Sequence, residues 1–120
     1  MMRIPFDPSR SADQSFQVLI PEHQVVSLRM VWNSRASGWD VEVSSSSSTG
    51  KIGFLRLVPK WPLLNDHAAI SPIDGDIIAL PLTGGSGKAF DEYGALGDSW
   101  GLFWLSQDDV KSWRAANGLG

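Results

Sequence analysis

The sequence predicts a mainly β fold, a small antiparallel β-barrel or sandwich of five to six strands that ends in a short C-terminal helix. Short runs of apolar residues alternate with polar residues, which is the period of a strand with one buried face. Clusters of glycine, proline and serine separate these runs, as expected for turns. The length of 120 residues fits one domain over 1–120, with a strand-rich part at 4–105 and a helix at about 107–117.

The first three strands are predicted by composition and alternation. Residues 16–20 are a short β-rich run that ends before a proline, and residues 24–33 alternate for ten positions. The apolar face of the second run is Val26, Leu28, Met30 and Trp32. After a loop at 34–38 that ends in glycine, alternation resumes with Trp39, Val41 and Val43. Two alternating runs around a short glycine-ended loop predict a β-hairpin.

The middle of the chain predicts a turn, a strand and a crossing segment. Residues 44–50 are mostly serine, which indicates a mobile hairpin tip that buries nothing. A fourth strand is expected at 52–58. Pro59 and Pro62 follow, and because prolines do not fit a central ladder, residues 59–64 are expected to cross as an extended segment.

Two further strands are predicted before the helix. Residues 76–82 form one of them, and Pro81 places it at a sheet edge because proline lacks the backbone donor. A flexible glycine-rich loop at 83–87 follows. Residues 99–105 form the last strand, with Trp100, Leu102 and Trp104 on one face.

The helix is predicted by its capping residues. Ser106 can cap the N-terminus, and Asp109 three residues later completes the acidic form of a capping box. Leu105 and Val110 occupy the positions of a hydrophobic staple, and Gly118 is a C-terminal stop. The stripe expected to dock the helix is Val110, Trp113 and Ala116.

Charge and composition argue against several classes of function. A net charge of −3 gives no electrostatic reason to bind nucleic acid or an anionic membrane. The chain has no cysteine, which excludes a disulfide, a thiolate nucleophile or a cysteine zinc site. The longest uncharged stretch, 77–87, is shorter than the roughly 20 apolar residues that a membrane span needs, so no span is expected.

No motif predicts a catalytic, cofactor or metal site. Residues 82–89 resemble a phosphate-binding loop, but Leu82 stands at the position of its first glycine and Ala89 at that of the magnesium-binding hydroxyl. His67 lies near three carboxylates, Asp66, Asp74 and Asp76, with a spacing that matches no metal motif. We therefore expect a loose loop and a solvated acidic turn.

The six tryptophans divide into two groups. Four lie on the inward faces of predicted strands, and core packing explains them: Trp32, Trp39, Trp100 and Trp104. Trp61, on the proline-rich segment, is expected to be either a lid over the domain or an anchor in a partner's pocket. Trp113 is expected to dock the helix on its own sheet, with a subunit contact as the alternative.

Several stretches together resemble a known family. They are residues 4–8, 14–18, the hairpin 28–35 with 38–43, residues 57–64, and residues 90–97. In this order, from about Ile4 to Leu105, the chain resembles the small baseplate plug proteins of cyanophage-type contractile tails. The most specific piece is the W-N-x-R … G-W hairpin. The serine-rich tip departs from the usual Asp-Gly type of turn, and the terminal helix is an extension beyond the family's last strand.

The resemblance implies a non-enzymatic structural protein of the virion, in a tail baseplate assembled in the host cytoplasm. It would lie in the hub, closing the central channel between tail tube and spike. The implied partners are hub and spike proteins and the tail tube or tape-measure end, with copies arranged about a three-fold axis. The candidate interface residues are Trp61, Leu63, Leu64, Tyr93 and Trp113.

A carbohydrate-binding β-module is the alternative function, because tryptophans on a β-scaffold can stack on sugars. It would require two or more tryptophans exposed on one face. A hydrolase is the third alternative, although the sequence places no pair of acidic residues at a spacing from which a catalytic geometry can be inferred.

Overall fold

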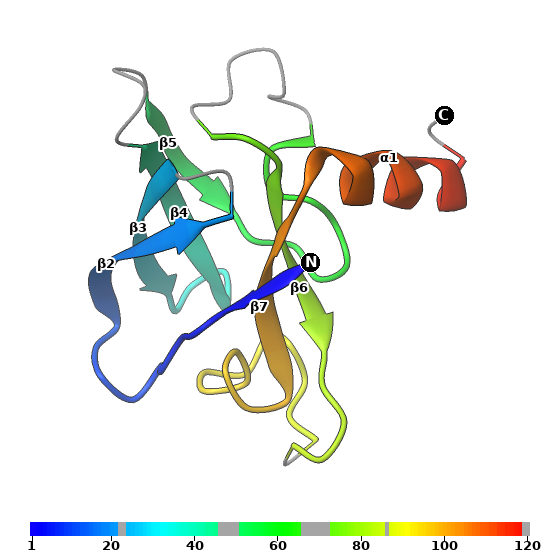
Figure 1. Ribbon diagram of the computed structural model, residues 1–120. Coiled ribbons are helices and arrows are strands. Elements are labelled where there is room, and N and C mark those ends of the chain that lie inside the picture. The colour runs from blue at the N-terminus through cyan, green and yellow to red at the C-terminus, as the bar shows by residue number, and fades with distance from the viewer. Residues whose placement is uncertain (22–23, 46–50, 66–72, 86, 119–120) are drawn as a thin grey trace.

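The computed structural model describes residues 1–120 except 22–23, 46–50, 66–72, 86 and 119–120. It contains seven strands and one helix in the described residues (Figure 1). They are β1 (Met2–Ile4), β2 (Asp13–Ile20), β3 (Gln24–Asn33), β4 (Gly38–Ser45), β5 (Lys51–Arg56), β6 (Asp76–Pro81), β7 (Trp100–Leu105) and α1 (Gln107–Ala116).

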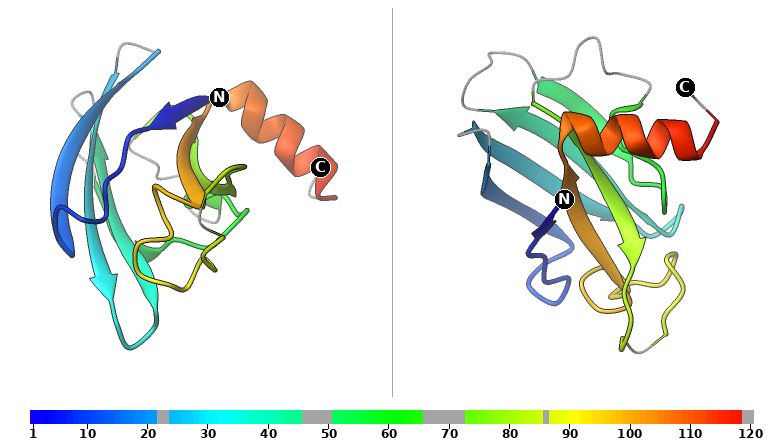
Figure 2. Two further views of the ribbon diagram at one scale, coloured as in Figure 1. Left: turned by 90° about the horizontal axis from the view of Figure 1, so that it is seen from below. Right: turned by 45° about the vertical axis from the view of Figure 1, so that its right-hand side comes forward.

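The strands form two antiparallel sheets, one in the order β2-β3-β4-β5 and one in the order β1-β7-β6. The left view of Figure 2 shows them as two facing layers with α1 outside. The mainly β prediction is confirmed, and the architecture is a sandwich, since the described strands do not close into a barrel. The sequence predicted five or six strands, and the structure has one that was not predicted, β1.

The predicted hairpin is confirmed, although Gly38, expected as the last residue of the loop, already belongs to β4. Trp32 on β3 lies opposite Trp39 on β4, and Asn33 opposite Gly38. The Asn33 side-chain oxygen accepts hydrogen bonds from the backbone N–H groups of Arg35 and Ala36, which fixes the turn. The prediction was wrong at Ser44 and Ser45, which belong to β4 and pair with β3. The rest of the predicted serine tip, 46–50, lies outside the described residues.

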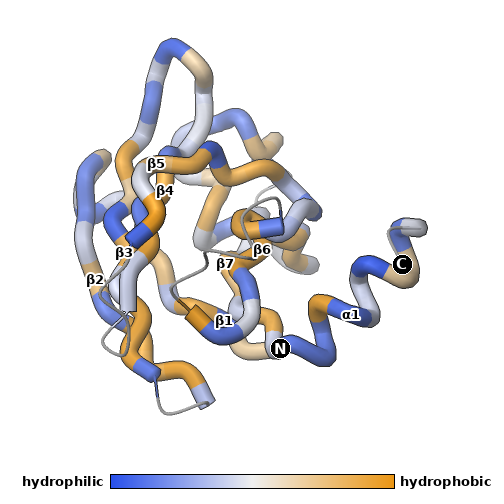
Figure 3. The backbone as a smooth tube through the Cα atoms, turned by 90° about the horizontal axis from the view of Figure 1, so that it is seen from above, coloured by the Kyte–Doolittle hydropathy of each residue, from blue (hydrophilic) through white to orange (hydrophobic). Residues whose placement is uncertain are grey.

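The core draws on both sheets. Figure 3 shows hydrophobic residues running along β6 and β7, while α1 is mostly hydrophilic. The largest fully buried side chains are Trp39, Ile4, Ile20, Leu28, Met30, Leu57, Leu64, Ile77, Ile78, Leu96, Leu102 and Val26. The alternation of β3 is therefore confirmed: its inward face is buried, and only Trp32 at its end remains half-buried.

The segment that leads from β5 to β6 ties the two sheets together. Leu57 N–H donates to Trp39 O in one sheet, and the N–H groups of Lys60 and Leu63 donate to Ala79 O and Ile77 O in the other. The segment crosses as predicted, but it is not simply extended, because it turns at Lys60, which has a φ of 63°. It also covers the outer edge of β6, the edge position that Pro81 predicts.

The helix begins as its sequence predicts. Ser106 is the N-cap, and its side chain and that of Asp109 each accept a backbone hydrogen bond from the other residue. The N-terminal ammonium of Met1 lies 2.9 Å from the Asp109 carboxylate. No residue of α1 is fully buried. Val110 and Trp113 are half-buried, but Ala116 is exposed, so the predicted three-residue stripe was wrong at Ala116.

Candidate functional site

An aromatic pair joins the C-terminal helix to the crossing segment. The rings of Trp61 and Trp113 have centroids 5.1 Å apart and planes at 87°. Trp61 keeps 38% of its surface exposed. The helix thus docks on its own chain, but the aromatic partner of Trp113 belongs to the β5–β6 segment rather than to the sheet. Trp61 is positioned by the turn at Lys60, and the Trp61 N–H donates to Val58 O across this turn.

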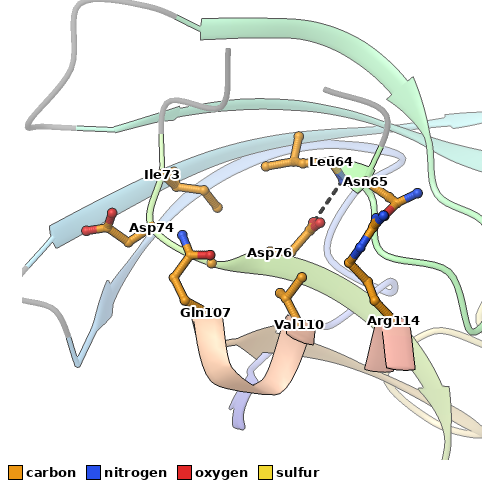
Figure 4. Close-up of a pocket in the computed structure, with 9 residues that line it drawn as sticks. Leu64, Asn65, Ile73, Asp74, Asp76, Gln107, Val110 and Arg114 are labelled. Carbon is orange, nitrogen blue, oxygen red and sulfur yellow. Dashed lines mark hydrogen bonds between the residues drawn. The ribbon is translucent and has the colours of Figure 1, made fainter. Parts of the chain in front are cut away.

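A cleft of about 500 Å³, here called the helix cleft, lies between α1 and the start of β6 (Figure 4). Its described lining is Leu64, Asn65, Ile73, Asp74, Gly75, Asp76, Gln107, Val110 and Arg114. The Arg114 guanidinium donates to Asn65 Oδ1 at 2.5 Å and so connects the helix to the opposite wall. Gly75, at a φ of 81°, allows the wall to approach β7: a Cβ there would lie 2.0 Å from Leu105 O.

The helix cleft contains a buried carboxylate. Asp76 is only 4% exposed, and its Oδ1 accepts hydrogen bonds from Leu64 N–H at 2.8 Å and Ile77 N–H at 2.7 Å. Burial disfavours the ionised form and raises the pKa of Asp76 to about 6, although the two hydrogen bonds act in the opposite direction. The expectation of a solvated acidic turn was therefore wrong for Asp76.

The acidic residues near Asp76 do not assemble a metal site in the described part of the chain. No group of three or more His, Cys, Asp or Glu residues is close enough there to hold an ion. Asp74 contributes through its backbone, whose carbonyl accepts from Trp104 Nε1 and whose N–H donates to Gln24. Asp66 and His67, the other members of the predicted turn, lie outside the described residues.

Tyr93 belongs to an aromatic cluster at another part of the sandwich. Its ring packs against Trp32 and Trp39, with centroids 5.2 and 5.8 Å apart, and Phe6 packs edge-on against Trp39. The Tyr93 hydroxyl donates to Pro8 O at 2.7 Å. Tyr93 remains 44% exposed, so it closes the cluster and still presents an edge to the surface.

The remaining interface candidates lie inside. Leu63 is 8% exposed and Leu64 1%, because the crossing segment turns them into the core beneath α1. A partner can therefore reach Trp61, Tyr93 and Trp113 but not these two leucines.

The tryptophans do not form a sugar-binding platform in the described structure. Trp39 and Trp104 are buried, and Trp32 and Trp100 are half-buried in the sandwich. The remaining pair, the exposed Trp61 and the half-buried Trp113, stands edge to face rather than presenting two coplanar rings.

The glycine-rich loop after β6 is explained by packing. Leu82 N–H donates to Ser99 O, and Lys88 N–H donates to the Ser99 hydroxyl. A Cβ at Gly85 would lie 2.6 Å from Asp98 O, so glycine is required for this close approach. Ser86 lies outside the described residues.

Comparison with known proteins identifies the family. A family model described as cyanophage baseplate Pam3 plug gp18 matches residues 1–108. The match ends two residues into α1. No curated protein matches the chain significantly. Among the described residues, no helix has the length and apolar character needed to cross a membrane. Because the family match spans most of the sequence, the chain belongs to the cyanophage baseplate plug family.

Proposed function

We propose that the protein lies in the tail hub and closes the central channel between the tail tube and the spike until injection. The observation that carries this proposal is the family match over residues 1–108. Membership of a baseplate plug family points to a structural component that associates with other proteins of the tail baseplate rather than to an enzyme. The position in the hub and the closing of the channel are the proposed steps.

The architecture is compatible with a plug. The described core is continuous across both sheets, and the crossing segment is hydrogen-bonded to each of them. The body measures 33 × 31 × 25 Å. A body with a close-packed interior resists deformation, which is what an occluding element needs.

We further propose that copies are arranged about the three-fold axis of the hub, because closed symmetry is the ordinary way for a small chain to surround or fill an axial channel. The partners would be hub and spike proteins and the tail tube or tape-measure end. Trp61, Tyr93 and Trp113 are the reachable aromatic candidates for these contacts, since exposed aromatic residues are frequent anchors at interfaces.

Site-specific cross-linking of intact particles tests this proposal. The chain has no cysteine, so a single Val58→Cys variant, beside Trp61 and 46% exposed at that position, gives one defined attachment point. We expect products with hub, spike, tube-end or tape-measure proteins. A second variant, Asp91→Cys near Tyr93, reports on the other candidate surface. Cross-links to outer wedge or fibre proteins alone would overturn the proposed location.

Channel closure is tested separately by omitting the protein. Particles assembled without it should lose internal tail contents or DNA before contact with a host, and the unaltered chain supplied in trans should restore retention. Particles that lack the protein but retain their contents would contradict the proposed closing role.

A further inference from the structure

The four sheet edges of the sandwich differ in how they are protected. An exposed edge carries unpaired backbone groups, and proteins usually cover, shorten, charge or distort it. The edge of β6 is covered by the crossing segment, and β1 is only three residues long. β5 carries the exposed charges Lys51 and Arg56 and pairs with β4 through a shift in register.

β2 lacks most of these protections: its one charged residue, Asp13, stands at the first position of the strand and forms an ion pair with Arg29 of β3. It runs for eight residues in unbroken register with β3 and contains no proline, glycine or lysine. Its other side has no strand partner among the described residues. Leu19 on this strand is 64% exposed, although leucine has no polar group that favours contact with water. β2 is therefore a long, regular and open edge.

The backbone direction along β2 follows from the ladder. Trp32 N–H donates to Ala12 O, which makes this a hydrogen-bonded pair. Because such pairs recur at every second residue of an antiparallel ladder, the even-numbered residues of β2 face β3 with their backbone groups. The backbone groups of Ser15, Gln17 and Leu19 consequently point away from β3, toward the open side.

A groove of about 370 Å³, here called the β2 groove, runs beside this edge. Its described lining is Pro5, Phe6, Asp7, Arg10, Gln14, Phe16, Gln17 and Val18. Phe6, Phe16 and Val18 supply its apolar part, and the first two pack with ring centroids 6.1 Å apart. A strand laid along β2 would direct every second side chain to the face that carries Phe16 and Val18.

We propose that β2 accepts an extended segment of a neighbouring baseplate protein as an additional strand, with apolar side chains of that segment entering the β2 groove. The backbone groups of Ser15, Gln17 and Leu19 provide affinity, and the groove provides selectivity, as in other cases of strand addition. A single strand fits this edge better than a second copy of the chain, because a second copy joined through β2 would bring its own residues 5–10 to the same place. The inference does not depend on where in the baseplate the chain lies.

The first test removes one backbone donor. Gln17→Pro deletes an N–H that points to the open side, and proline is tolerated on an edge strand when that N–H is not part of the ladder. Gln17→Ala is the matched control, since it loses the same side chain but keeps the donor. Thermal melting first establishes that both variants are folded. We then expect the amount of Gln17→Pro incorporated into particles to be at least about tenfold lower than that of Gln17→Ala. Equal incorporation would overturn the proposal.

A second measurement covers the case in which Gln17→Pro fails to fold. A photo-cross-linking amino acid at Leu19 should react in intact particles with another baseplate protein, and the peptide recovered should be an extended apolar segment. The same group at Phe54, on β5, is the control position. Products only with a second copy of this chain, or no product above the Phe54 control, would overturn the proposal. Neither result bears on channel closure, which is read from retention of the particle contents.

Discussion

Replacing Asp76 by asparagine should stabilise the protein at neutral and alkaline pH. The buried carboxylate uses Oδ1 to accept hydrogen bonds from Leu64 and Ile77, and an asparagine oxygen can accept both without a charge. Among the described residues no cation forms an ion pair with Asp76, so only the two backbone hydrogen bonds offset part of the cost of burying its charge.

The magnitude follows from the pKa. Folding raises the pKa of Asp76 from 3.8 to about 6, a difference of roughly two units or about 3 kcal/mol. The folded state binds the proton more tightly, so stability from this group is fully present below pH 3.8 and is lost as the pH rises through about 6. Asparagine removes the penalty but needs a partner for its amino group, so we expect a net gain of about 1–3 kcal/mol at pH 8.

Urea unfolding of both proteins at pH 5 and pH 8 measures this effect. The gain from Asp76→Asn should be larger at pH 8 than at pH 5, and the histidine contributions common to both proteins cancel in the comparison. Asp7, Asp13 and Asp109 have pKa values below their ordinary range, so their effects fall at lower pH. Asp76→Leu is the control that removes the two accepted hydrogen bonds, and it should destabilise at both pH values. An Asp76→Asn gain that is absent, or identical at pH 5 and 8, would refute the reasoning.

Three further changes test the fold. Trp39→Ala should cost about 3–5 kcal/mol in denaturant melts, because Trp39 is buried among Phe6, Trp32 and Tyr93, and a loss under about 1 kcal/mol would contradict its place in the core. Ser106→Ala should cost about 1 kcal/mol and reduce helical circular dichroism, whereas Ser106→Asp should retain most of both. Deleting the residues after Leu105 should lower the melting temperature by several degrees, because Trp113 and Arg114 contact Trp61 and Asn65. An unchanged melt combined with failed incorporation would show instead that a baseplate partner holds the helix.

Short-range sequence patterns correctly predicted the hairpin and the start of the helix, because neighbouring residues determine both. The alternation around Trp32 and Trp39 located the hairpin, and the capping residues Ser106 and Asp109 located the start of α1. β1 was missed because it has three residues, too few to show a period, and its partner strand β7 lies near the other end of the sequence.

The candidate site depended more on long-range packing. In the sequence, Asp76 is one of several acidic residues in a predicted turn. Its burial arises only when the crossing segment and α1 come together around β6. Leu63 and Leu64 follow a proline-rich stretch that resembles an exposed connection, yet the turn at Lys60 directs them inward. The contact between Trp61 and Trp113 joins positions more than fifty residues apart, and no spacing rule links them.

The crossing segment gives the sandwich an asymmetric resistance to opening. Its hydrogen bonds from Leu57 to one sheet and from Lys60 and Leu63 to the other hold the two sheets together along this side of the sandwich. Local opening fluctuations would then separate the two sheets at the opposite side. There β1 is only three residues long, and the outer edge of β2 has no strand partner among the described residues. Among these hydrogen-bonded amides, exchange with solvent would consequently be slower at Leu57, Lys60 and Leu63 than in β1 and β2. A strand inserted at that side would restrain the motion, so assembly into the baseplate would also stiffen the protein.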